Sequence, residues 1–201
     1  MKKLKIAVTG NIGSGKSSFC KFLEEFGYPV IKADDIAKDL LANDKKVKRE
    51  IIKHFGIPAY KGDELNKKFL ADQVFSNQLK LNRINSIIHP RVIRKVNSLM
   101  DKQLKTSGLI FHEAALIYEA DIEDLFDIVI LISANYKVRM ERKKIHDNFS
   151  EEQFAMRDSN QIPEEEKKKC ADFVFSNNNT LHNLKTKAEL LIKILNGLIQ
   201  Q

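Results

Sequence analysis

The residues with the clearest chemistry lie near the start of the sequence, where residues 10–17 read Gly-Asn-Ile-Gly-Ser-Gly-Lys-Ser. This spacing matches the pattern G-x-x-x-x-G-K-[ST] of phosphate-binding loops. Its glycines let the backbone turn so that several amide N–H groups face one anion, and a following helix adds its positive dipole end. Lys16 would place an ammonium group against the β- and γ-phosphates of ATP, and the Ser17 hydroxyl would bind Mg²⁺. The residues that we expect to contact ATP here are Asn11, Ile12, Gly13, Ser14, Gly15, Lys16, Ser17 and Ser18.

Two aspartates follow the apolar residues 29–31, at a point where a doubly wound sheet places its ligands. A carboxylate in this place can accept or orient the proton of an attacking hydroxyl group. Aspartate is also a favoured N-cap residue of helices, so both roles are open. We favour the catalytic role for Asp34 and the capping role for Asp35.

A second acidic position follows the apolar segment 109–111. Glu113 lies at its end, where a carboxylate can hold Mg²⁺ through water in the manner of a Walker-B acid. Glu119 is a weaker candidate in the same loop. Ser17 and Glu113 are therefore the expected metal-binding residues, and Mg²⁺ is the expected cofactor.

Arginines recur in the highly charged residues 136–170. Arg139 and Arg142 are one helical turn apart, and Arg157 follows them. Phosphoryl transfer needs positive charge over the migrating group, and a guanidinium supplies it through a fork of donors. A charged cover would also keep water away from ATP. A solvated helix face is the ordinary alternative for such a charge run. We expect Arg142 to act in catalysis and Arg139 to contact the substrate.

The elements that must position these residues read as alternating strands and helices. Residues 17–26 predict an amphipathic helix that ends at Gly27, and it lies between two apolar segments, so a strand–helix–strand unit and a parallel sheet follow. We expect a P-loop NTPase fold, a three-layer α/β/α arrangement with about five parallel strands, a helical substrate-binding insertion and a lid. The expected strands are residues 5–9, 29–31, 109–111, 128–132 and 173–175, and the last helix is residues 181–198.

The middle of the chain, about residues 45–105, reads as charged and mostly helical. We expect Pro90 to divide its helices and residues 56–62 to form a loop. His89-Pro90 alone would be an ordinary helix boundary. The charged residues 136–170 are also expected to be helical, with one helix opened by Pro163.

Composition and net charge limit which binding partners and which cellular compartment we expect. The chain has 201 residues, of which 43% are hydrophobic and 30% charged, and a net charge of +7. A polyphosphate metabolite suits this charge; we expect no nucleic acid and no membrane as partner, because the basic residues are scattered and no long apolar run occurs. Two cysteines far apart in sequence favour a reduced, cytoplasmic location. We expect a monomer or a weak homo-oligomer.

Several segments together resemble the dephospho-CoA kinase family. They are the Gly-x-Ile-Gly-Ser-Gly-Lys-Ser loop, Val-Ile-x-Ala-Asp-x-Ile-Ala at residues 30–37, His89-Pro90, Leu-Ile-Tyr-Glu ending at Glu119, Arg157 with Gln161, and Ala-Asp-Phe-Val leading to Asn177. They follow the family's order over nearly the whole chain. The loop alone is shared by many families, whereas the combination is much more specific.

The resemblance implies an activity and roles for single residues. The family transfers the γ-phosphate of ATP to the ribose 3′-hydroxyl of 3′-dephospho-CoA, the last step of coenzyme A synthesis. Asp34 matches its proposed base, His89 its substrate-side motif, Arg142 its lid arginine, and Asn177 the segment near adenine. The chain would be one domain, with a core of about residues 1–44, 106–135 and 171–201, a CoA-binding part of about 45–105 and a lid of about 136–170.

The chain departs from the family's pattern at three places. Lys32 stands where the family has the first aspartate of Asp-Ala-Asp, so Asp34 is the one matching acid there. Residues 115–119 read Ala-Leu-Ile-Tyr-Glu in place of Pro-Leu-Leu-Phe-Glu. His146 replaces the second arginine of the lid helix. These changes concern fine tuning more than the reaction.

Three other functions can be compared with this one. The nearest is another P-loop small-molecule kinase, of the nucleoside monophosphate or shikimate type. A GTPase switch would need an Asn-Lys-x-Asp segment to hold guanine, but residues 66–69 read Asn-Lys-Lys-Phe. A nucleic-acid-dependent ATPase is supported by the net charge alone.

Overall fold

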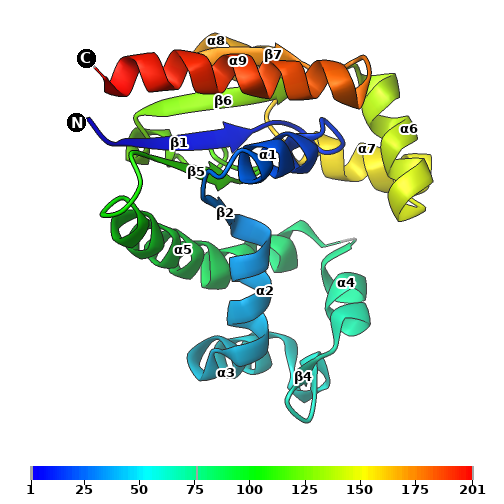
Figure 1. The fold of residues 1–201 in the computed structure, drawn as a ribbon. Coiled ribbons are helices and arrows are strands. Elements are labelled where there is room, and N and C mark those ends of the chain that lie inside the picture. Colours follow the sequence, from blue (N-terminus) through cyan, green and yellow to red (C-terminus); the bar gives the residue numbers. More distant parts are fainter. Residues whose placement is uncertain (1, 76, 201) are drawn as a thin grey trace. The chain divides into compact units, whose positions relative to one another are not determined.

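The computed structural model describes residues 2–75 and 77–200, and its main element is a five-stranded sheet (Figure 1). The strand order is β2-β5-β1-β6-β7. β1 pairs in parallel with β5 and with β6, and β6 pairs in parallel with β7. The predicted parallel α/β sheet is therefore confirmed. The strands are β1 (Leu4–Thr9), β2 (Val30–Lys32), β5 (Leu109–Glu113), β6 (Ile128–Ser133) and β7 (Phe173–Ser176).

The register of the sheet brings the ends of three strands to one edge. Val8 lies opposite Glu113, and Thr9 lies opposite Leu131. The chain continues from β1 directly into the glycine-rich loop, so this loop lies beside the end of β5. β6 is buried along its whole length, which explains its unbroken apolar sequence, because a parallel sheet is covered on both faces.

One face of the sheet is covered by the helices α1 (Lys16–Glu25) and α9 (Leu181–Ile199), which lie side by side (Figure 1). Apolar residues spaced by three and four positions place one stripe of each helix on the strands. The buried residues that α1 and α9 contribute to this core are Phe19, Cys20, Leu23, Leu184, Ala188, Leu191, Ile192 and Leu195. The sequence predicted both helices to within a residue or two.

A smaller core covers the opposite face. Ala7 and Val129 from the sheet pack there against Ile117 and Tyr118. The chain between β5 and β6 crosses this face and contains a short 3₁₀ helix, η2 (Glu123–Leu125). The helix α8 (Glu164–Cys170) lies next to β6. Helices and irregular chain thus form the outer layers of the expected three-layer arrangement.

Residues 136–170, the predicted lid, form α6 (Tyr136–Asp147), α7 (Glu151–Ser159) and α8. A capping box begins α7, because the Ser150 hydroxyl accepts from Gln153 N and the Gln153 side chain accepts from Ser150 N. Tyr136 and Phe154 pack edge to face, with ring centroids 5.2 Å apart, and join α6 to α7.

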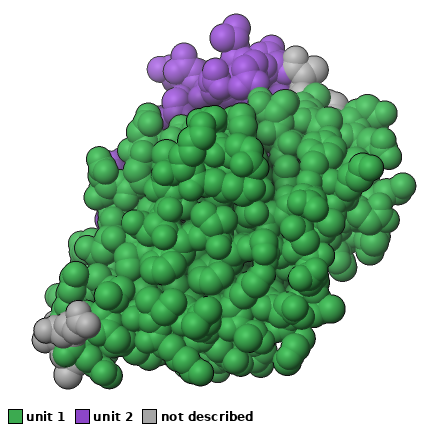
Figure 2. Space-filling model, turned by 90° about the horizontal axis from the view of Figure 1, so that it is seen from above, with its two compact units in different colours: residues 1–31, 100–201 green, residues 32–99 purple. Residues whose placement is uncertain are grey.

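Two compact units make up the chain, residues 1–31 with 100–201 and residues 32–99 (Figure 2). The second unit has its own buried residues, among them Val47, Ile51 and Tyr60. The Tyr60 hydroxyl donates to the Leu41 carbonyl at 2.7 Å, and Arg91 pairs with Glu50 at 2.7 Å. Its helices are α2 (Ala33–Asn43), α3 (Lys45–Phe55), η1 (Ile57–Ala59), α4 (Lys67–Phe75) and most of α5 (Gln78–Gln103).

Pro90 does not divide the middle helices, so that expectation is wrong. The helix α5 is 26 residues long and runs through Pro90 without a break. Proline lacks the N–H that would bond one turn back, which normally breaks or kinks a helix. Here Ile87, Ile88 and Val92 are buried on both sides of Pro90, and the Arg91 guanidinium donates to the Ile87 carbonyl at 2.6 Å. Burial on both sides offsets the lost backbone bond.

Residues 56–62 are also more ordered than the loop that the sequence predicted. After η1 they begin an antiparallel hairpin of β3 (Tyr60–Lys61) and β4 (Glu64–Leu65). Gly62 turns the chain with φ 61°, a conformation that favours glycine. Lys48 donates to the Gly62 carbonyl at 2.8 Å and pairs with Asp63. Two-residue strands are too short to show a period in the sequence, so the hairpin was missed.

His112 gives the stability of the fold a pH dependence. It is 2% exposed in β5, its ring stacks on Phe126, and its Nδ1 lies 3.0 Å from the Ile31 carbonyl. Burial lowers its pKa from the ordinary 6.5 to about 4, against an opposing effect of the bond to Ile31. Because the unfolded chain binds this proton more readily, the free energy of unfolding should fall by about 3 kcal/mol as the pH drops from 6.5 to 4.

Urea unfolding of the wild type and of His112→Gln between pH 4 and 7 measures this contribution. The variant should show a flatter pH dependence, because the titrating group is gone. His182→Gln, on an exposed part of α9, is the matched control. An equally steep pH dependence in His112→Gln would rule out His112 as the cause.

Among the described residues, no helix is both long and apolar enough to cross a membrane.

Candidate active site

The glycine-rich loop closes tightly around its own backbone. Gly13 has φ 78° and Gly15 has φ 97°, values that side chains rarely allow. A Cβ atom on Gly13 would lie 2.5 Å from the Arg139 carbonyl oxygen, and one on Gly15 would collide with the Asn177 side-chain amide. Glycine is therefore required twice over, by the backbone turn and by the neighbouring chain. The loop rests on the start of α6 and on the residue that follows β7.

Lys16 begins α1 and turns its side chain back over the loop. Its Nζ donates to the Gly10 carbonyl at 2.8 Å and to the Asn11 carbonyl at 3.4 Å. The Phe19 N–H donates to the Gly15 carbonyl at the start of α1. The N–H groups of the first turn are those that helices in general offer to anions, together with the positive end of the helix dipole. The Lys16 ammonium group thus lies over the loop that leads into this helix start.

Ser17 and Glu113 meet at the edge of the sheet. The Ser17 hydroxyl donates to Glu113 Oε1 at 2.6 Å. Ser17 is exposed and Glu113 is half-buried at the end of β5. Hydroxyl and carboxylate oxygens are the hard ligands that Mg²⁺ takes, and Mg²⁺ usually binds one or two protein oxygens and completes its shell with phosphates and water. In the described part of the chain, three or more His, Cys, Asp or Glu side chains nowhere gather as a metal site. The pair therefore fits a metal ion that arrives with a nucleotide.

Asn177 and Arg142 hold the loop from the side of β7 and α6. The side-chain amide of buried Asn177 donates to the Ser14 carbonyl at 2.8 Å. The backbone carbonyl of Asn177 accepts from Arg142 Nη2, also at 2.8 Å. Arg142 Nη1 lies 3.4 Å from the Ser14 carbonyl. Partial burial lowers the pKa of the Arg142 guanidinium. A forked cation is thus present directly beside the loop.

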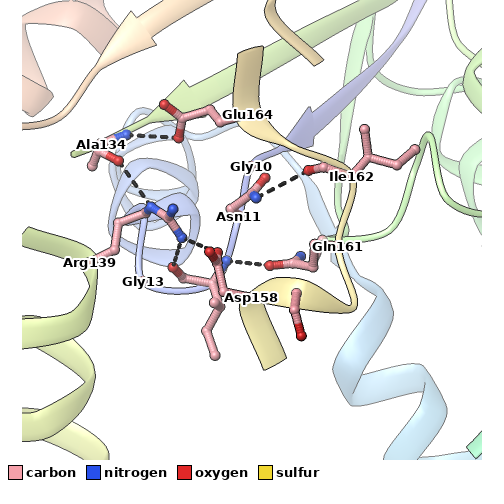
Figure 3. A network of polar contacts seen from close by, with 12 residues as sticks. Gly10, Asn11, Gly13, Ala134, Arg139, Asp158, Gln161, Ile162 and Glu164 are labelled. Atoms are coloured by element: carbon pink, nitrogen blue, oxygen red, sulfur yellow. Dashed lines mark hydrogen bonds and ion pairs between the residues drawn. The ribbon is translucent and has the colours of Figure 1, made fainter. Parts of the chain in front are cut away.

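Arg139 is engaged with the protein itself (Figure 3). It is 5% exposed, and its guanidinium donates to the Ala134 carbonyl at 3.0 Å, to the Ile12 carbonyl at 3.2 Å and to Asp158 at 2.5 Å. The rings of Tyr136 and Phe154 lie 5.6 and 5.7 Å from it. These contacts make Arg139 a support of the loop, a role that sequence reasoning did not assign to it.

Residues between α7 and α8 reach the other side of the loop, as Figure 3 shows. The Gln161 side-chain oxygen accepts from Ile12 N at 2.7 Å, and the Asn11 side chain donates to the Ile162 carbonyl at 3.2 Å. Glu119 accepts from Ile162 N at 2.9 Å and pairs with fully buried Lys167 at 2.7 Å. Because this carboxylate is already neutralised by Lys167, Glu119 is poorly suited to hold Mg²⁺.

Comparison with known proteins identifies the family. The model of a family described as dephospho-CoA kinase matches residues 4–183. The dephospho-CoA kinase of Fusobacterium nucleatum is 36% identical over 190 residues, which are 94% of this chain and 97% of that protein. The enzyme of Protochlamydia amoebophila is 33% identical over 187 residues, 92% of each chain. This chain belongs to the dephospho-CoA kinase family.

Solved structures agree with the family. A protein from Thermus thermophilus superposes with a TM-score of 0.78 at 32% identity, covering 97% of this chain and 99% of that one. The dephospho-CoA kinase from Campylobacter jejuni gives a TM-score of 0.67 at 27% identity, covering 95% and 96%. A shikimate kinase from Acinetobacter baumannii, at 13% identity and a TM-score of 0.54, covers 97% and 94% and shows the shared fold alone. The chain is thus a kinase with the P-loop α/β fold, and the resemblance found in its sequence is confirmed.

Most predicted site residues of this family member meet around the loop. Ser18 is half-buried in the first turn of α1, beside Ser17. Two other predicted residues belong to the second unit: Asp34 is exposed in the first turn of α2, and His89 is half-buried in α5, where burial lowers its pKa. The structure therefore groups the nucleotide-side predictions, and it describes Asp34 and His89 within their own unit.

Asp35 does not cap α2, so that expectation is wrong. The N-cap residue is Lys32, without a side-chain hydrogen bond, and both aspartates lie in the first turn. There a carboxylate still stabilises the helix through its dipole. Asp35 pairs with Lys38 at 3.2 Å. His146, which replaces a family arginine, is exposed in the last turn of α6.

Sequence reasoning missed the buried polar residues that support the loop. Lys167 lies among the highly charged residues 136–170, where its sequence context indicates no special role, but it is fully buried against Glu119. Asp158 was not singled out, although it neutralises Arg139. One signal was present, because Gln161 belonged to the family resemblance. Without the fold, nothing in its spacing connected Gln161 to Ile12.

Proposed function

We propose that this chain transfers the γ-phosphate of ATP to the 3′-hydroxyl of the ribose of 3′-dephospho-CoA, which yields coenzyme A and ADP. The observation that carries this proposal is the phosphate-binding loop with the Ser17–Glu113 pair at its mouth, in a chain that matches the dephospho-CoA kinase family from residue 4 to residue 183. The relatives named above carry that enzyme's name over nearly their full length.

The loop would bind ATP through its backbone and Lys16. The ammonium group of Lys16 would exchange the Gly10 and Asn11 carbonyls for phosphate oxygens, which accept more strongly because they are charged. Ser17 would bind Mg²⁺ directly and Glu113 through water, and the ion would offset charge on the phosphates as the group transfers. Asn177 would act near adenine. Its bond to the Ser14 carbonyl already joins that segment to the loop.

Arg142 would stabilise the migrating phosphoryl group from the proposed lid, about residues 136–170. Its half-buried guanidinium touches three backbone carbonyls, those of Gly13, Ser14 and Asn177. Neutral carbonyls hold a guanidinium less strongly than a carboxylate does, so Arg142 can turn to a phosphate at small cost. Arg139, in contrast, is paired with Asp158. We therefore keep the catalytic proposal for Arg142 and give the proposed substrate contact of Arg139 a secondary part.

The second unit is suited to an anionic acceptor. Residues 32–99 hold 15 Lys and Arg against 8 Asp and Glu, a net charge of +7, whereas the rest of the chain holds 19 of each. The whole net charge of the protein thus belongs to this unit. A substrate with a pyrophosphate group would be attracted to it. This supports our proposal that about residues 45–105 form the CoA-binding part, with His89 on the substrate side.

Asp34 is the proposed base. Of the two aspartates in the first turn of α2, Asp35 is already in an ion pair with Lys38. An exposed carboxylate can accept or orient the proton of the ribose hydroxyl as it attacks. Positioning and charge stabilisation would supply most of the rate, as in phosphoryl transfer generally.

A coupled assay of ADP release with dephospho-CoA as acceptor tests the function. AMP and shikimate serve as competing acceptors at the same concentration. We expect turnover of dephospho-CoA alone. Preference for AMP or shikimate would instead make the chain a different small-molecule kinase. We further propose a cytoplasmic enzyme, supported by Cys20 and Cys170, neither of which forms a disulfide.

Glu113→Gln tests the proposed metal site. Losing the carboxylate that supports a metal typically costs tenfold or more in metal affinity. We therefore expect the Mg²⁺ concentration for half-maximal activity to rise about tenfold, with activity partly restored at high Mg²⁺. Glu141→Gln, on the exposed side of α6, is the control. An unchanged Mg²⁺ requirement in Glu113→Gln would remove Glu113 from the metal site.

A further inference from the structure

The segment 158–162, at the end of α7 and just after it, is bonded to the phosphate-binding loop directly at two points and through Arg139 at a third. Gln161 accepts from Ile12 N, Asp158 holds Arg139 against the Ile12 carbonyl, and the Ile162 carbonyl accepts from Asn11. Figure 3 shows these groups arranged around the loop. Both backbone polar groups of Ile12 are therefore engaged by residues of the proposed lid.

The arrangement is mostly shielded from water, which strengthens it. The side chain of Arg139 is 6% exposed and that of Asp158 is 19% exposed. Charge-assisted bonds of this kind are shorter and stronger than neutral ones. The segment is itself anchored, since Glu119 accepts from Ile162 N and is neutralised by buried Lys167. Movement of Gln161 away from the loop would cost Ile12 N this acceptor, and movement of Asp158 would cost the buried Arg139 guanidinium its carboxylate.

Ile12 lies between Gly10 and Gly13, which both have positive φ angles, 150° and 78°. Glycines give the chain many alternative conformations, so a loop that contains three of them needs outside contacts to keep its amides converged on one anion. The bonds to Ile12 provide such contacts. The conformational entropy of the loop is then already lost when the protein folds, before a nucleotide binds.

We propose that Gln161 and Asp158 are positioning residues for the nucleotide: they hold Ile12, and through it the phosphate-binding loop, in the conformation that receives ATP. The inference rests on the assignment of residues 10–17 as the ATP site and adds residues that act through that loop. It also explains the ion pair between Arg139 and Asp158, because Asp158 orients the guanidinium that donates to the Ile12 carbonyl.

Gln161→Met tests the first residue, because methionine keeps the length of the side chain and removes the acceptor. We expect the Kd of ATP·Mg²⁺, measured by calorimetry at 20 °C without dephospho-CoA, to rise about fivefold, the worth of one hydrogen bond. Gln153→Met is the matched control. At the start of α7 it removes the same kind of bond, in which a backbone N–H donates to a glutamine side-chain oxygen. The control should bind ATP as the wild type does.

Asp158→Asn tests the second residue and keeps the side-chain shape. Arg139 would lose its charged partner and hold Ile12 less firmly, so the Kd of ATP·Mg²⁺ should rise by roughly three- to tenfold. Asp147→Asn breaks the more exposed pair with Lys143 in α6 and is the control. Melting temperatures of all four variants separate a general loss of stability from a local effect, because Kd is measured well below unfolding.

The outcomes differ for this inference and for the function. Wild-type protein that fails to bind ATP would refute the function and this inference together. Wild-type binding with unchanged Kd in both Gln161→Met and Asp158→Asn would refute the positioning role alone. The positioning role is equally refuted if each variant changes Kd only as much as its control. If Gln161→Met does not fold, Asp158→Asn decides.

Discussion

Replacing Lys16 by alanine should lower kcat/KM for dephospho-CoA phosphorylation about 10³-fold, which corresponds to about 4 kcal/mol of transition-state stabilisation. The reason is geometric. The Lys16 ammonium lies 2.8 Å from the Gly10 carbonyl, where it would meet the charge that develops on the transferring group. The measurement is steady-state ADP release with both substrates varied. ATP binding should weaken as well.

Lys21→Ala is the matched control for this experiment, because Lys21 lies on the exposed side of the same helix. It removes one positive charge from α1 and leaves the loop intact, so activity should stay within about twofold of the wild type. Activity of Lys16→Ala equal to that of Lys21→Ala would refute the assignment of the loop as the ATP phosphate site. Circular dichroism of both variants checks that α1 still forms.

The second large effect is expected at Asp34, in the other unit. Asp34→Ala should reduce kcat by roughly 10²- to 10⁴-fold, the usual contribution of a general base. The Kd of ATP·Mg²⁺ should hardly change, because the proposed nucleotide contacts belong to residues of the first unit. A single-turnover measurement at saturating ATP separates the chemical step from product release.

Asp35→Ala provides the control in the same turn of α2. It removes the exposed ion pair with Lys38, a type of contact worth at most about 1 kcal/mol, and leaves Asp34 in place. We expect near-wild-type turnover. If Asp34→Ala also turns over at the wild-type rate, the base is another group and the carboxylate only supports α2. Loss of ATP binding in Asp34→Ala would equally contradict its assigned role.

Lys32 stands two residues before Asp34 in this chain. The family pattern has an aspartate there, whereas this chain has a lysine at the end of β2, directly before α2. Asp34 is therefore expected to carry out the proton step without the second acid of the family pattern.

Local patterns were sufficient for the elements whose physical signal is contiguous. The helix α1 has its apolar stripe, its glycine start and its glycine end within about a dozen residues, and the sequence predicted it to within one residue. The strands β1 and β6 are almost wholly buried, so their mostly apolar sequences identified them. Pro90 and the hairpin after Gly56 were misjudged because burial on α5 and two-residue strands leave no such contiguous signal.

The sequence by itself determined the phosphate-binding loop, since its glycines, its lysine and its serine are consecutive and the helix that completes it follows at once. Only the tertiary structure decided what supports that loop. Ile12 and Gln161 are 149 positions apart, and Asn177 and Ser14 are 163 apart. Such pairs depend on the strand order and register of the sheet, which no local pattern encodes. Buried polar groups must find partners wherever the fold brings them, so Arg139 and Lys167 show their roles only once the chain is folded.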